Sequence, residues 1–424
     1  MFVKKKNIIE EVPNLSFREW ELNLNDKLLN EFKYLKTIDN NKTYLLHLKY
    51  EELKKYIETK NNKQRIQSLF NKTQSFDDMI EFINNDKNDI QFILADKEPY
   101  KTDWLLLKLF VSTLYWSQNP GRNLRYLVQI NGKYAGILSL GSDVIAMSER
   151  DNYIGWDKST KIGELKRLNN TCIASSIVST QPLGYMTTGG KLLSLLLFSN
   201  IFQKNWKERY NDTLAGITTT ALYGIHSQYN GMPKYWKTLG MTKGKVNLSP
   251  MEETYSEIRE YCLKRSKVDK EFSEKYNNAI SSKKSTGDTK CDCATGPKQN
   301  ILNLYYKESG FKDLLVSNNI KSKDLFSGFE KGIYFAKLYE NTLDYLQGKI
   351  NDDQLIQRKD LDFDVNDTNS IVDFWKRKYA KNRLLKTMEL DFKVREKFFY
   401  DKIFETNTLQ EFMNIYDPKN VVSD

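Results

Sequence analysis

The stretch from Gly121 to Val246 constrains the fold more than any other part of the chain. It begins with two runs rich in aromatic, aliphatic and β-branched residues, 124–130 and 134–140, separated by Asn131-Gly132. Asn-Gly adopts the positive φ angles that a tight hairpin turn requires. The pattern therefore predicts a β-hairpin, and glycines in its second strand mark places where a bulge or a ligand is accommodated.

After the hairpin, strand patterns alternate with helix patterns. The predicted elements, in order, are strand 172–180, a glycine-containing loop, helix 191–210, strand 212–222, short helix 233–239 and strand 242–246. An apolar helix over 104–116 precedes the hairpin, because leucines and aromatic residues recur there at helical spacing. We therefore expect a mixed sheet with a helical crossover between its later strands.

The flanks of this core have helical periodicity and many lysines. We expect a mainly helical region 1–100, an α/β core 101–250 and a helical region 251–424 with a flexible linker near 281–297. In the last region the predicted helices are 254–276, 300–306 and 371–404, the last being one long basic amphipathic helix or a helix pair, with an aromatic-rich stretch at 328–339. The chain has 424 residues, enough for two or three domains.

The charge balance indicates an anionic partner. The formal net charge is +10, from 65 basic and 55 acidic residues, which favours nucleic acid. The alternative is a genome whose codons favour Lys and Asn, because no basic block stands alone. The basic residues of the C-terminal half that lie among aromatic residues are Lys298, Lys307, Lys331, Lys337, Arg377, Lys378, Lys381 and Arg383. They predict contacts with double-stranded DNA, or else a solvated helix face.

Several other classes of protein are disfavoured. The four cysteines fit neither a disulfide framework nor a zinc site, and Cys291-x-Cys293 falls in the linker. No signal peptide pattern is present, and the longest apolar run, 192–198, is too short for a membrane span. We expect a protein without a membrane partner in the cytoplasm of a bacterial host. The oligomeric state is not indicated.

The order of elements resembles the GNAT acyltransferase architecture. In that fold a central strand is followed by a loop that holds a pyrophosphate at a helix N-terminus. The resemblance implies an α+β fold with a GNAT-like mixed β-sheet core flanked by helical N- and C-terminal regions. It assigns cofactor binding to Gly184, Gly189, Gly190 and Lys191. Met186 stands at the third glycine position of the family's loop, which counts against acyl-CoA.

The same loop is a near miss for a P-loop. Gly184 and Gly189 have the required spacing, but Gly190 intervenes before the lysine, and Leu192 replaces the Ser/Thr that binds magnesium. Nucleotide hydrolysis is therefore disfavoured.

A more specific resemblance is to the Druantia anti-phage defence protein DruA family. Four motifs match in order: Gly-Arg-Asn-Leu-Arg-Tyr-Leu-Val at 121–128, Arg-Asp-Asn-Tyr-Ile-Gly-Trp at 150–156, Asn-Asn at 169–170 and Trp-Lys-Glu-Arg-Tyr at 206–210. The outline of that family is similar to the phage Mom proteins, which convert adenine in DNA to a carbamoylmethyl form that resists restriction. Iron in Mom-like proteins is assigned to an acidic residue and a tyrosine near the final short helix.

This resemblance suggests roles for individual residues. His226 and Tyr235 are the candidate metal ligands and catalytic residues, since histidine can replace a carboxylate as a ligand. The alternative for His226 is a polar loop residue. Ser175 and Ser176 are further catalytic candidates, because strand alternation directs one of them to the site. The alternative is a close-packed strand that needs small residues.

Four more residues are candidates for substrate binding: Arg122, Arg125, Asn170 and Ser227. The two arginines could hold a phosphate or a carboxylate, or else form a solvated hairpin end. Trp206, Arg209 and Tyr210 are expected to pack at a helix end.

The leading hypothesis is a phage or mobile-element enzyme that adds a small acyl-derived group to adenine in DNA, with iron as a candidate cofactor and an unidentified donor. One alternative is a non-catalytic DNA-binding component of an anti-phage defence or transposition system. Another is a GNAT acyltransferase that acts on a protein or a small amine.

Overall fold

The computed structural model describes residues 17–36, 60–111, 121–222, 227–242, 250, 252–281, 295–320 and 330–388. Contacts divide the chain into two compact units. A helical unit comprises residues 1–44 and 246–329, and a sheet unit comprises residues 45–245 and 330–424. The units interleave along the sequence, whereas the sequence analysis divides the chain into three consecutive regions.

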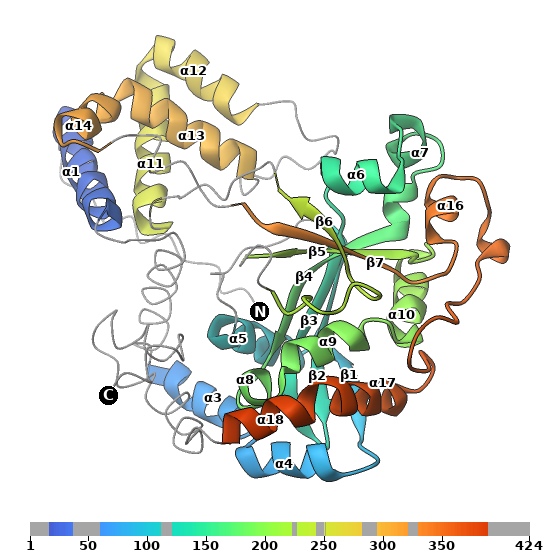
Figure 1. Cartoon of the computed structure of the whole chain (residues 1–424). Helices are drawn as coiled ribbons and strands as arrows, with labels where there is room; N and C mark the ends of the chain where they lie inside the picture. The colour runs from blue at the N-terminus through green and yellow to red at the C-terminus, as the bar shows by residue number, and fades with distance from the viewer. Residues whose placement is uncertain are drawn as a thin grey trace. The chain divides into compact units, whose positions relative to one another are not determined.

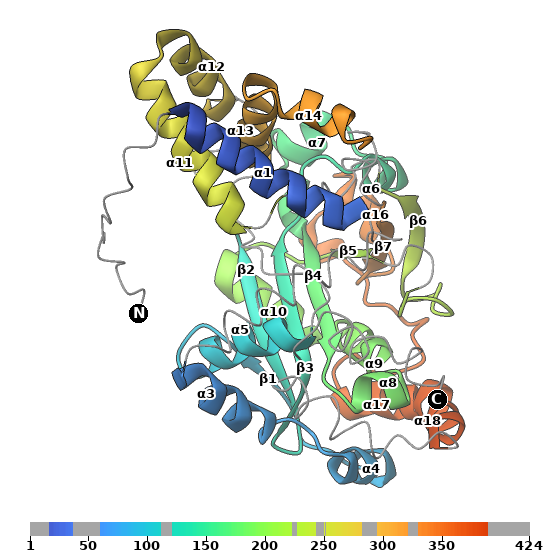
Figure 2. The same cartoon turned by 90° about the vertical axis from the view of Figure 1, so that its left-hand side faces the viewer.

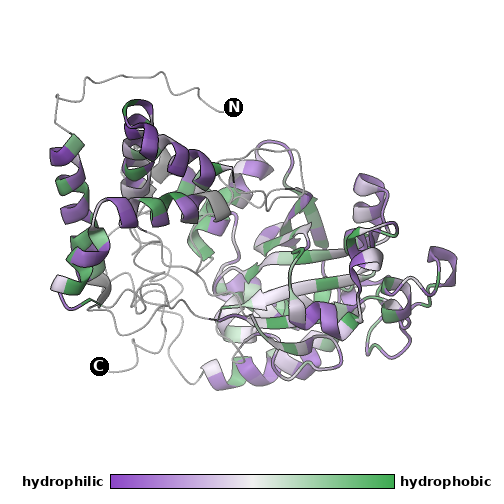
Figure 3. Ribbon diagram, turned by 90° about the horizontal axis from the view of Figure 1, so that it is seen from above, coloured by the Kyte–Doolittle hydropathy of each residue, from purple (hydrophilic) through white to green (hydrophobic). Residues whose placement is uncertain are grey.

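Five described helices form the helical unit: α1 (Phe17–Lys36), α11 (Glu252–Val268), α12 (Lys270–Ile280), α13 (Thr295–Glu308) and α14 (Phe311–Ser317). Hydrophilic and hydrophobic residues alternate along them (Figure 3), as expected for helices that bury one face. The single helix predicted over 254–276 is wrong. Asp269 begins a new helix there, because its side chain accepts a hydrogen bond from the Phe272 N–H at 3.0 Å.

A seven-stranded mixed sheet forms the centre of the sheet unit (Figure 1). Its strands are β1 (Ile90–Leu94), β2 (Asn123–Ile130), β3 (Lys133–Ser142), β4 (Thr171–Ser179), β5 (Gly216–Ala221), β6 (Lys237–Met241) and β7 (Gly332–Lys337). The spatial order is β1-β2-β3-β4-β5-β7-β6. Only β4 and β5 pair in parallel, and all other neighbours are antiparallel. The predicted α+β class with a mixed sheet and flanking helices is confirmed.

The predicted hairpin joins β2 to β3. Asn131 and Gly132 have φ angles of 51° and 78°, and Ile130 pairs with Lys133 across the turn. Both central residues therefore have the positive φ that the Asn-Gly pair was expected to supply.

The far side of the sheet differs from the prediction. The tyrosine-bearing segment 233–239 does not form a helix: residues 233–235 make a turn, and β6 begins at Lys237. The predicted last strand, 242–246, lies almost wholly outside the described residues. Its place is taken by β7, which comes from the aromatic-rich stretch at 328–339 and lies between β5 and β6. Five of its six residues are buried, so no alternation marks it as a strand.

Helices cover both faces of the sheet (Figure 2). On one face, α3 (Lys60–Phe70) and α5 (Tyr100–Val111) bury Leu69, Trp104 and Leu107 against β2 and β3. Opposite them lies a larger core that includes residues of α4 (Phe76–Asn84), α9 (Gly189–Leu196), α10 (Asn200–Tyr210) and α17 (Thr368–Trp375). The remaining described helices of this unit are α6 (Ser148–Ile154), α7 (Lys158–Ile162), α8 (Leu183–Thr187), α16 (Thr342–Leu346) and α18 (Lys381–Met388). None of the helices in the described ranges is long and apolar enough to cross a bilayer.

The connection from β4 to β5 is helical, as parallel pairing requires. The single helix predicted over 191–210 is instead divided into α9 and α10. Ser199 caps the second part, since its hydroxyl accepts from the Ile201 N–H at 3.4 Å. Trp206 is buried beneath Tyr210 with ring centroids 4.8 Å apart, which confirms the predicted packing for these two residues. Arg209 is instead exposed and forms an ion pair with Asp96.

Candidate functional site

The two parallel strands at the centre of the sheet separate after a short contact. Pairing between β4 and β5 covers only Thr171–Ile173 and Gly216–Thr218. Beyond it, side chains replace the missing strand pairing along β4. The Thr219 hydroxyl donates to the Ala174 carbonyl at 2.9 Å, and the Gln228 amide donates to the Ile177 carbonyl at 3.1 Å. The gap between the strands therefore contains side chains of the same protein.

The predicted cofactor-binding glycines lie beside this gap. A Cβ at Gly184 would lie 2.7 Å from the Ser179 hydroxyl oxygen, and a Cβ at Gly189 would lie 2.9 Å from it. At Gly190 a Cβ would lie 2.1 Å from the Gln228 carboxamide oxygen. These glycines thus allow close packing of the loop onto the protein itself.

Lys191, the fourth residue predicted to bind a cofactor, forms hydrogen bonds to the loop that contains Gln228 and Asn230. Its ammonium donates to the Gln228 carbonyl at 2.9 Å and to the Asn230 carbonyl. The Tyr379 ring lies 5.3 Å from the nitrogen. Burial lowers the pKa of the Lys191 amine to about 8, because the charged form is partly removed from water.

The two candidate serines lie at a β-bulge in β4. Ser139 of β3 pairs with Ser176, while the next residue of β3 pairs with Ala174, so Ser175 is the unpaired residue. Ser175 is exposed and Ser176 is buried. The Ser175 hydroxyl donates to that of Ser139 at 3.2 Å, and Ser139 donates to the Asn123 side chain at 3.2 Å. Ser175 is the serine that solvent can reach.

The candidate substrate-binding arginines have partners within the fold. Arg122 forms an ion pair with Asp212 at 2.5 Å, and its guanidinium lies 5.0 Å from the Tyr210 ring. Arg125 lies over the Trp104 ring at 5.0 Å, and burial lowers the pKa of its guanidinium. Both arginines are only partly exposed, so neither is a solvated hairpin end.

The other two candidate substrate residues make hydrogen bonds inside the sheet unit. Asn170 is buried and donates to the Thr213 carbonyl at 2.9 Å. Ser227 donates to the Tyr334 hydroxyl at 2.9 Å. Both contacts hold loops against β5 and β7.

Tyr235 is buried among aromatic rings, and His226 lies outside the described residues. The Tyr235 hydroxyl donates to Asp362, which also forms an ion pair with Lys234 at 2.9 Å. Burial and the Asp362 carboxylate raise the pKa of Tyr235. The assignment of iron to Tyr235 and His226 stays a prediction. The described ranges also contain no group of three or more His, Cys, Asp or Glu residues that could hold a metal.

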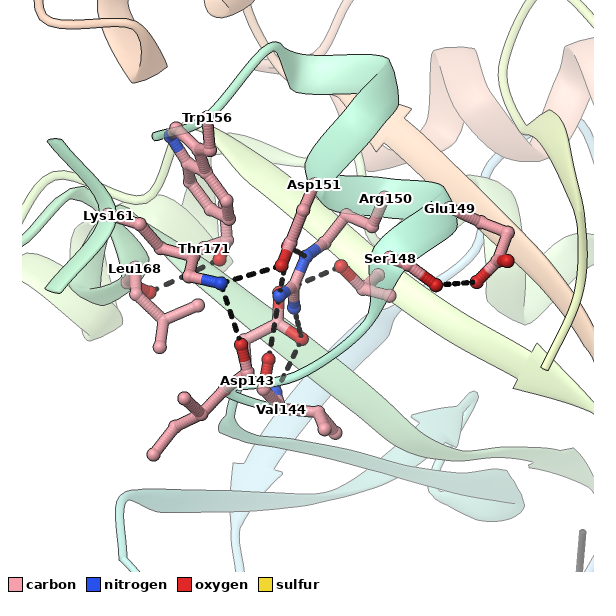
Figure 4. Close-up of polar contacts among 12 residues, drawn as sticks. Asp143, Val144, Ser148, Glu149, Arg150, Asp151, Trp156, Lys161, Leu168 and Thr171 are labelled. Carbon is pink, nitrogen blue, oxygen red and sulfur yellow. Dashed lines mark hydrogen bonds and ion pairs between the residues drawn. The ribbon is translucent and has the colours of Figure 1, made fainter. Parts of the chain in front are cut away.

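A buried ionic network lies where β3 ends, formed by Asp143, Arg150, Asp151 and Lys161 (Figure 4). Arg150 contacts Asp143 at 2.6 Å, and both side chains are fully buried. Asp151 contacts Arg150 at 2.7 Å and Lys161 at 2.6 Å. The Thr218 hydroxyl of β5 donates to Asp143 at 2.8 Å. The network thereby joins α6 and α7 to the sheet.

The end of α6 completes this attachment. Gly155 has a φ of 78° and caps the helix, and the Trp156 ring lies 5.2 Å from the Arg150 guanidinium. The Trp156 indole N–H donates to the Leu346 carbonyl at 2.6 Å. The motif at 150–156 is thus a structural attachment, a role that its residue types alone did not reveal.

A second charged region lies at the surface, on the continuous helical segment formed by α17, a π-helical turn (Lys376–Ala380) and α18. Arg377, Lys378, Lys381 and Lys386 are exposed there, and we call them the basic ridge. Among the residues that the structure describes, none of the four forms an ion pair with a carboxylate.

The π-helical turn is anchored from below. Lys376 is buried and donates to the Asn85 carbonyl at 2.6 Å, with the Phe82 ring 4.9 Å from its nitrogen. Burial lowers the pKa of the Lys376 amine. This anchor fixes the helical segment on the core while Arg377 and Lys378 stay in solvent.

Other basic residues predicted for DNA contact lie elsewhere. Lys298 and Lys307 belong to the helical unit, and Lys331 and Lys337 are partly buried near β7. Arg383 is half-buried over the Tyr185 ring at 4.9 Å. Sequence composition therefore identified three members of the ridge and missed Lys386.

Comparison with known proteins gives a single consistent result. The family model described as "Druantia protein DruA" matches residues 39–289, more than half of the 424 residues. The Druantia protein DruA of Escherichia coli (strain UMEA 4076-1) is 31% identical over 173 residues, which cover 36% of this chain and 42% of that protein. The match thus spans less than half of the relative's length. No solved structure matches significantly. The chain belongs to the DruA family, the family of the Druantia anti-phage defence protein.

Proposed function

We propose that this protein acts in anti-phage defence inside a bacterial cell as a DNA-binding component, and that the basic ridge contacts the phosphate backbone of double-stranded DNA. The observation that supports this proposal is the exposure of four basic side chains on one continuous helical segment. None of the four forms an ion pair within 4.0 Å of a carboxylate among the described residues, although Lys378 also interacts with Asp362 at longer range. Ordinary surface charges are dispersed or paired, whereas a row of unpaired cations attracts a polyanion.

The spacing of the ridge suits a nucleic acid backbone. Residues three and four apart lie side by side on a helix, as Lys378 and Lys381 or Arg377 and Lys381 do. One helical turn rises by about 5.4 Å. Phosphates of one DNA strand follow one another at about 3.4 Å along the axis, so basic side chains one turn apart can reach different phosphates.

The test is a titration of a labelled DNA duplex, followed by fluorescence anisotropy. The variant Arg377→Gln/Lys378→Gln/Lys381→Gln removes three charges from the ridge without touching the core. We expect its affinity for the duplex to fall more than about 10-fold at physiological salt.

A matched control removes the same number of charges elsewhere on the sheet unit. Lys97, Lys158 and Lys166 are exposed and lie outside the ridge. Their triple change to Gln should reduce affinity much less. Equal losses in the two triple variants would contradict a specific role for the ridge and leave only a general charge effect.

A second candidate function is base modification on a GNAT-like core similar to that of phage Mom proteins. Its support is the bulge in β4, which exposes Ser175 at the centre of the sheet, since bulges often direct a side chain at an active site. Central β4 is also followed by a loop, a helix start and parallel β5, in the order that this resemblance implies.

Mass spectrometry of nucleosides tests this second candidate. DNA from cells that express the parent protein would show a new adenine-derived species, and the Ser175→Ala and His226→Ala variants would lose it. DNA unchanged by the parent protein would count against modification and leave the DNA-binding proposal intact.

A further inference from the structure

Strands β4 and β5 pair only as far as Ile173 and Thr218, and we call the space between their unpaired parts the slot. The carbonyls of Ala174 and Ile177 lie on this edge of β4 and would be free to bind an extended ligand if no side chain reached them. Instead they accept hydrogen bonds from Thr219 and Gln228 at 2.9 Å and 3.1 Å. A ligand with backbone-like amides would need these same acceptors.

Gln228 occupies its place because Gly190 has no side chain. The carboxamide oxygen of Gln228 lies 2.1 Å from the position that a Cβ on residue 190 would take, and its Cδ lies 3.1 Å from that position. Any larger residue at position 190 would therefore displace the Gln228 side chain.

Two further contacts keep Gln228 in the slot. Its amide also donates to the buried Tyr229 hydroxyl at 3.1 Å, which in turn lies 3.3 Å from the Thr219 hydroxyl. Lys191 donates to the Gln228 main-chain carbonyl at 2.9 Å. Hydrogen bonds thus hold both the side chain and the main chain of Gln228 in place.

We propose that Gln228 is a plug that closes the slot between β4 and β5 against Gly190, and that the closed slot prevents this protein from binding acyl-CoA. The glycines of this loop, from which cofactor binding was predicted, instead leave space for the Gln228 side chain. A donor used by this protein would have to enter by another route. The inference does not depend on DNA binding, and neither of its tests uses DNA.

The first test measures the coupling between the two positions. Urea unfolding is compared for the parent, Gly190→Ala, Gln228→Ala and the double variant. In the Gln228→Ala background, the methyl group of Gly190→Ala meets the remaining Cβ of residue 228 at 3.4 Å, an ordinary van der Waals distance, and gains helix propensity, so the unfolding midpoint rises. In the parent background the added methyl group displaces the plug and the rise is lost or reversed. An equal change in both backgrounds would overturn the proposal.

A calorimetric titration with coenzyme A and acetyl-CoA is the second test. We expect no saturable binding to the parent protein at millimolar ligand. Saturable binding of either ligand with a Kd below about 1 mM would show that the slot is open and would overturn the proposal. As a control for general damage, Gln91→Ala changes an exposed glutamine of β1 and should leave both results unchanged.

Discussion

The buried ionic network and the basic ridge use the same residue types for opposite purposes. In the network, Arg150 is fully buried, and Asp143 and Asp151 balance its charge. On the ridge, Arg377 and Lys381 are exposed and have no described carboxylate partner. A buried charge must be neutralised within the fold, whereas an exposed one is available to a partner.

This difference separates stability from binding. Changes in the network should alter the free energy of unfolding and leave the DNA affinity of the folded protein unchanged. Changes on the ridge should do the reverse.

The largest effect is expected for Arg150→Met. The substitution leaves the Asp143 carboxylate buried without its cation, which costs about 3–5 kcal/mol of unfolding free energy. Urea denaturation measures the loss. Asp143→Leu/Arg150→Met should recover much of it, because no unpaired charge remains. A cost below about 1 kcal/mol for the single variant, which is typical of a surface pair, would show that the network is solvated.

Gly155→Ala tests the helix end that presents Arg150 and Asp151. Its φ of 78° is strained for alanine, and the new Cβ would lie 2.9 Å from the Gln347 amide nitrogen. We expect a loss of about 1–2 kcal/mol in urea unfolding. Gly231 has a φ of 75° but open space around it, so Gly231→Ala isolates the backbone strain. If the two variants lose equal stability, the Gln347 contact has no influence.

Tyr235→Phe removes the hydroxyl that donates to Asp362. Lys234 still pairs with this carboxylate, so the expected loss is about 0.5–1.5 kcal/mol. DNA affinity should not change, since Tyr235 is buried away from solvent. Loss of a modified nucleoside in this variant, with stability intact, would instead support a catalytic role for the hydroxyl.

The last stability prediction concerns pH. The pKa of Lys191 is lowered to about 8 from an ordinary value of 10.5. The folded protein therefore releases this proton at a lower pH than the unfolded chain does. Stability relative to Lys191→Met should therefore rise as the pH increases from 8 to 10.5, and be independent of pH below that window. Unfolding midpoints of the two proteins across this range provide the measurement, and a constant difference would contradict the lowered pKa.

Short sequence patterns predicted those elements whose conformation is set by a few neighbouring residues. The Asn131-Gly132 turn, strand β4 and the start of the glycine loop follow from backbone preferences of a few residues. Strand β7 could not be recognised, because it is buried on both faces and comes from a distant part of the sequence.

The candidate site was less predictable, because its contacts join residues that are far apart in the sequence. Arg122 and Tyr235 could be identified as polar residues near the core, but their partners Asp212 and Asp362 are set by tertiary packing. Gln228 has no periodic or motif signal, and only the fold places it over Gly190.

The most direct test of the account is the salt dependence of duplex DNA binding by the parent protein and by Arg377→Gln/Lys378→Gln/Lys381→Gln. Each phosphate contact contributes about 0.9 to the slope of log affinity against log salt concentration. We predict that the variant's slope is shallower by about 2.7, with an unchanged unfolding midpoint. Equal slopes for the two proteins would show that the ridge does not contact DNA and would contradict the account.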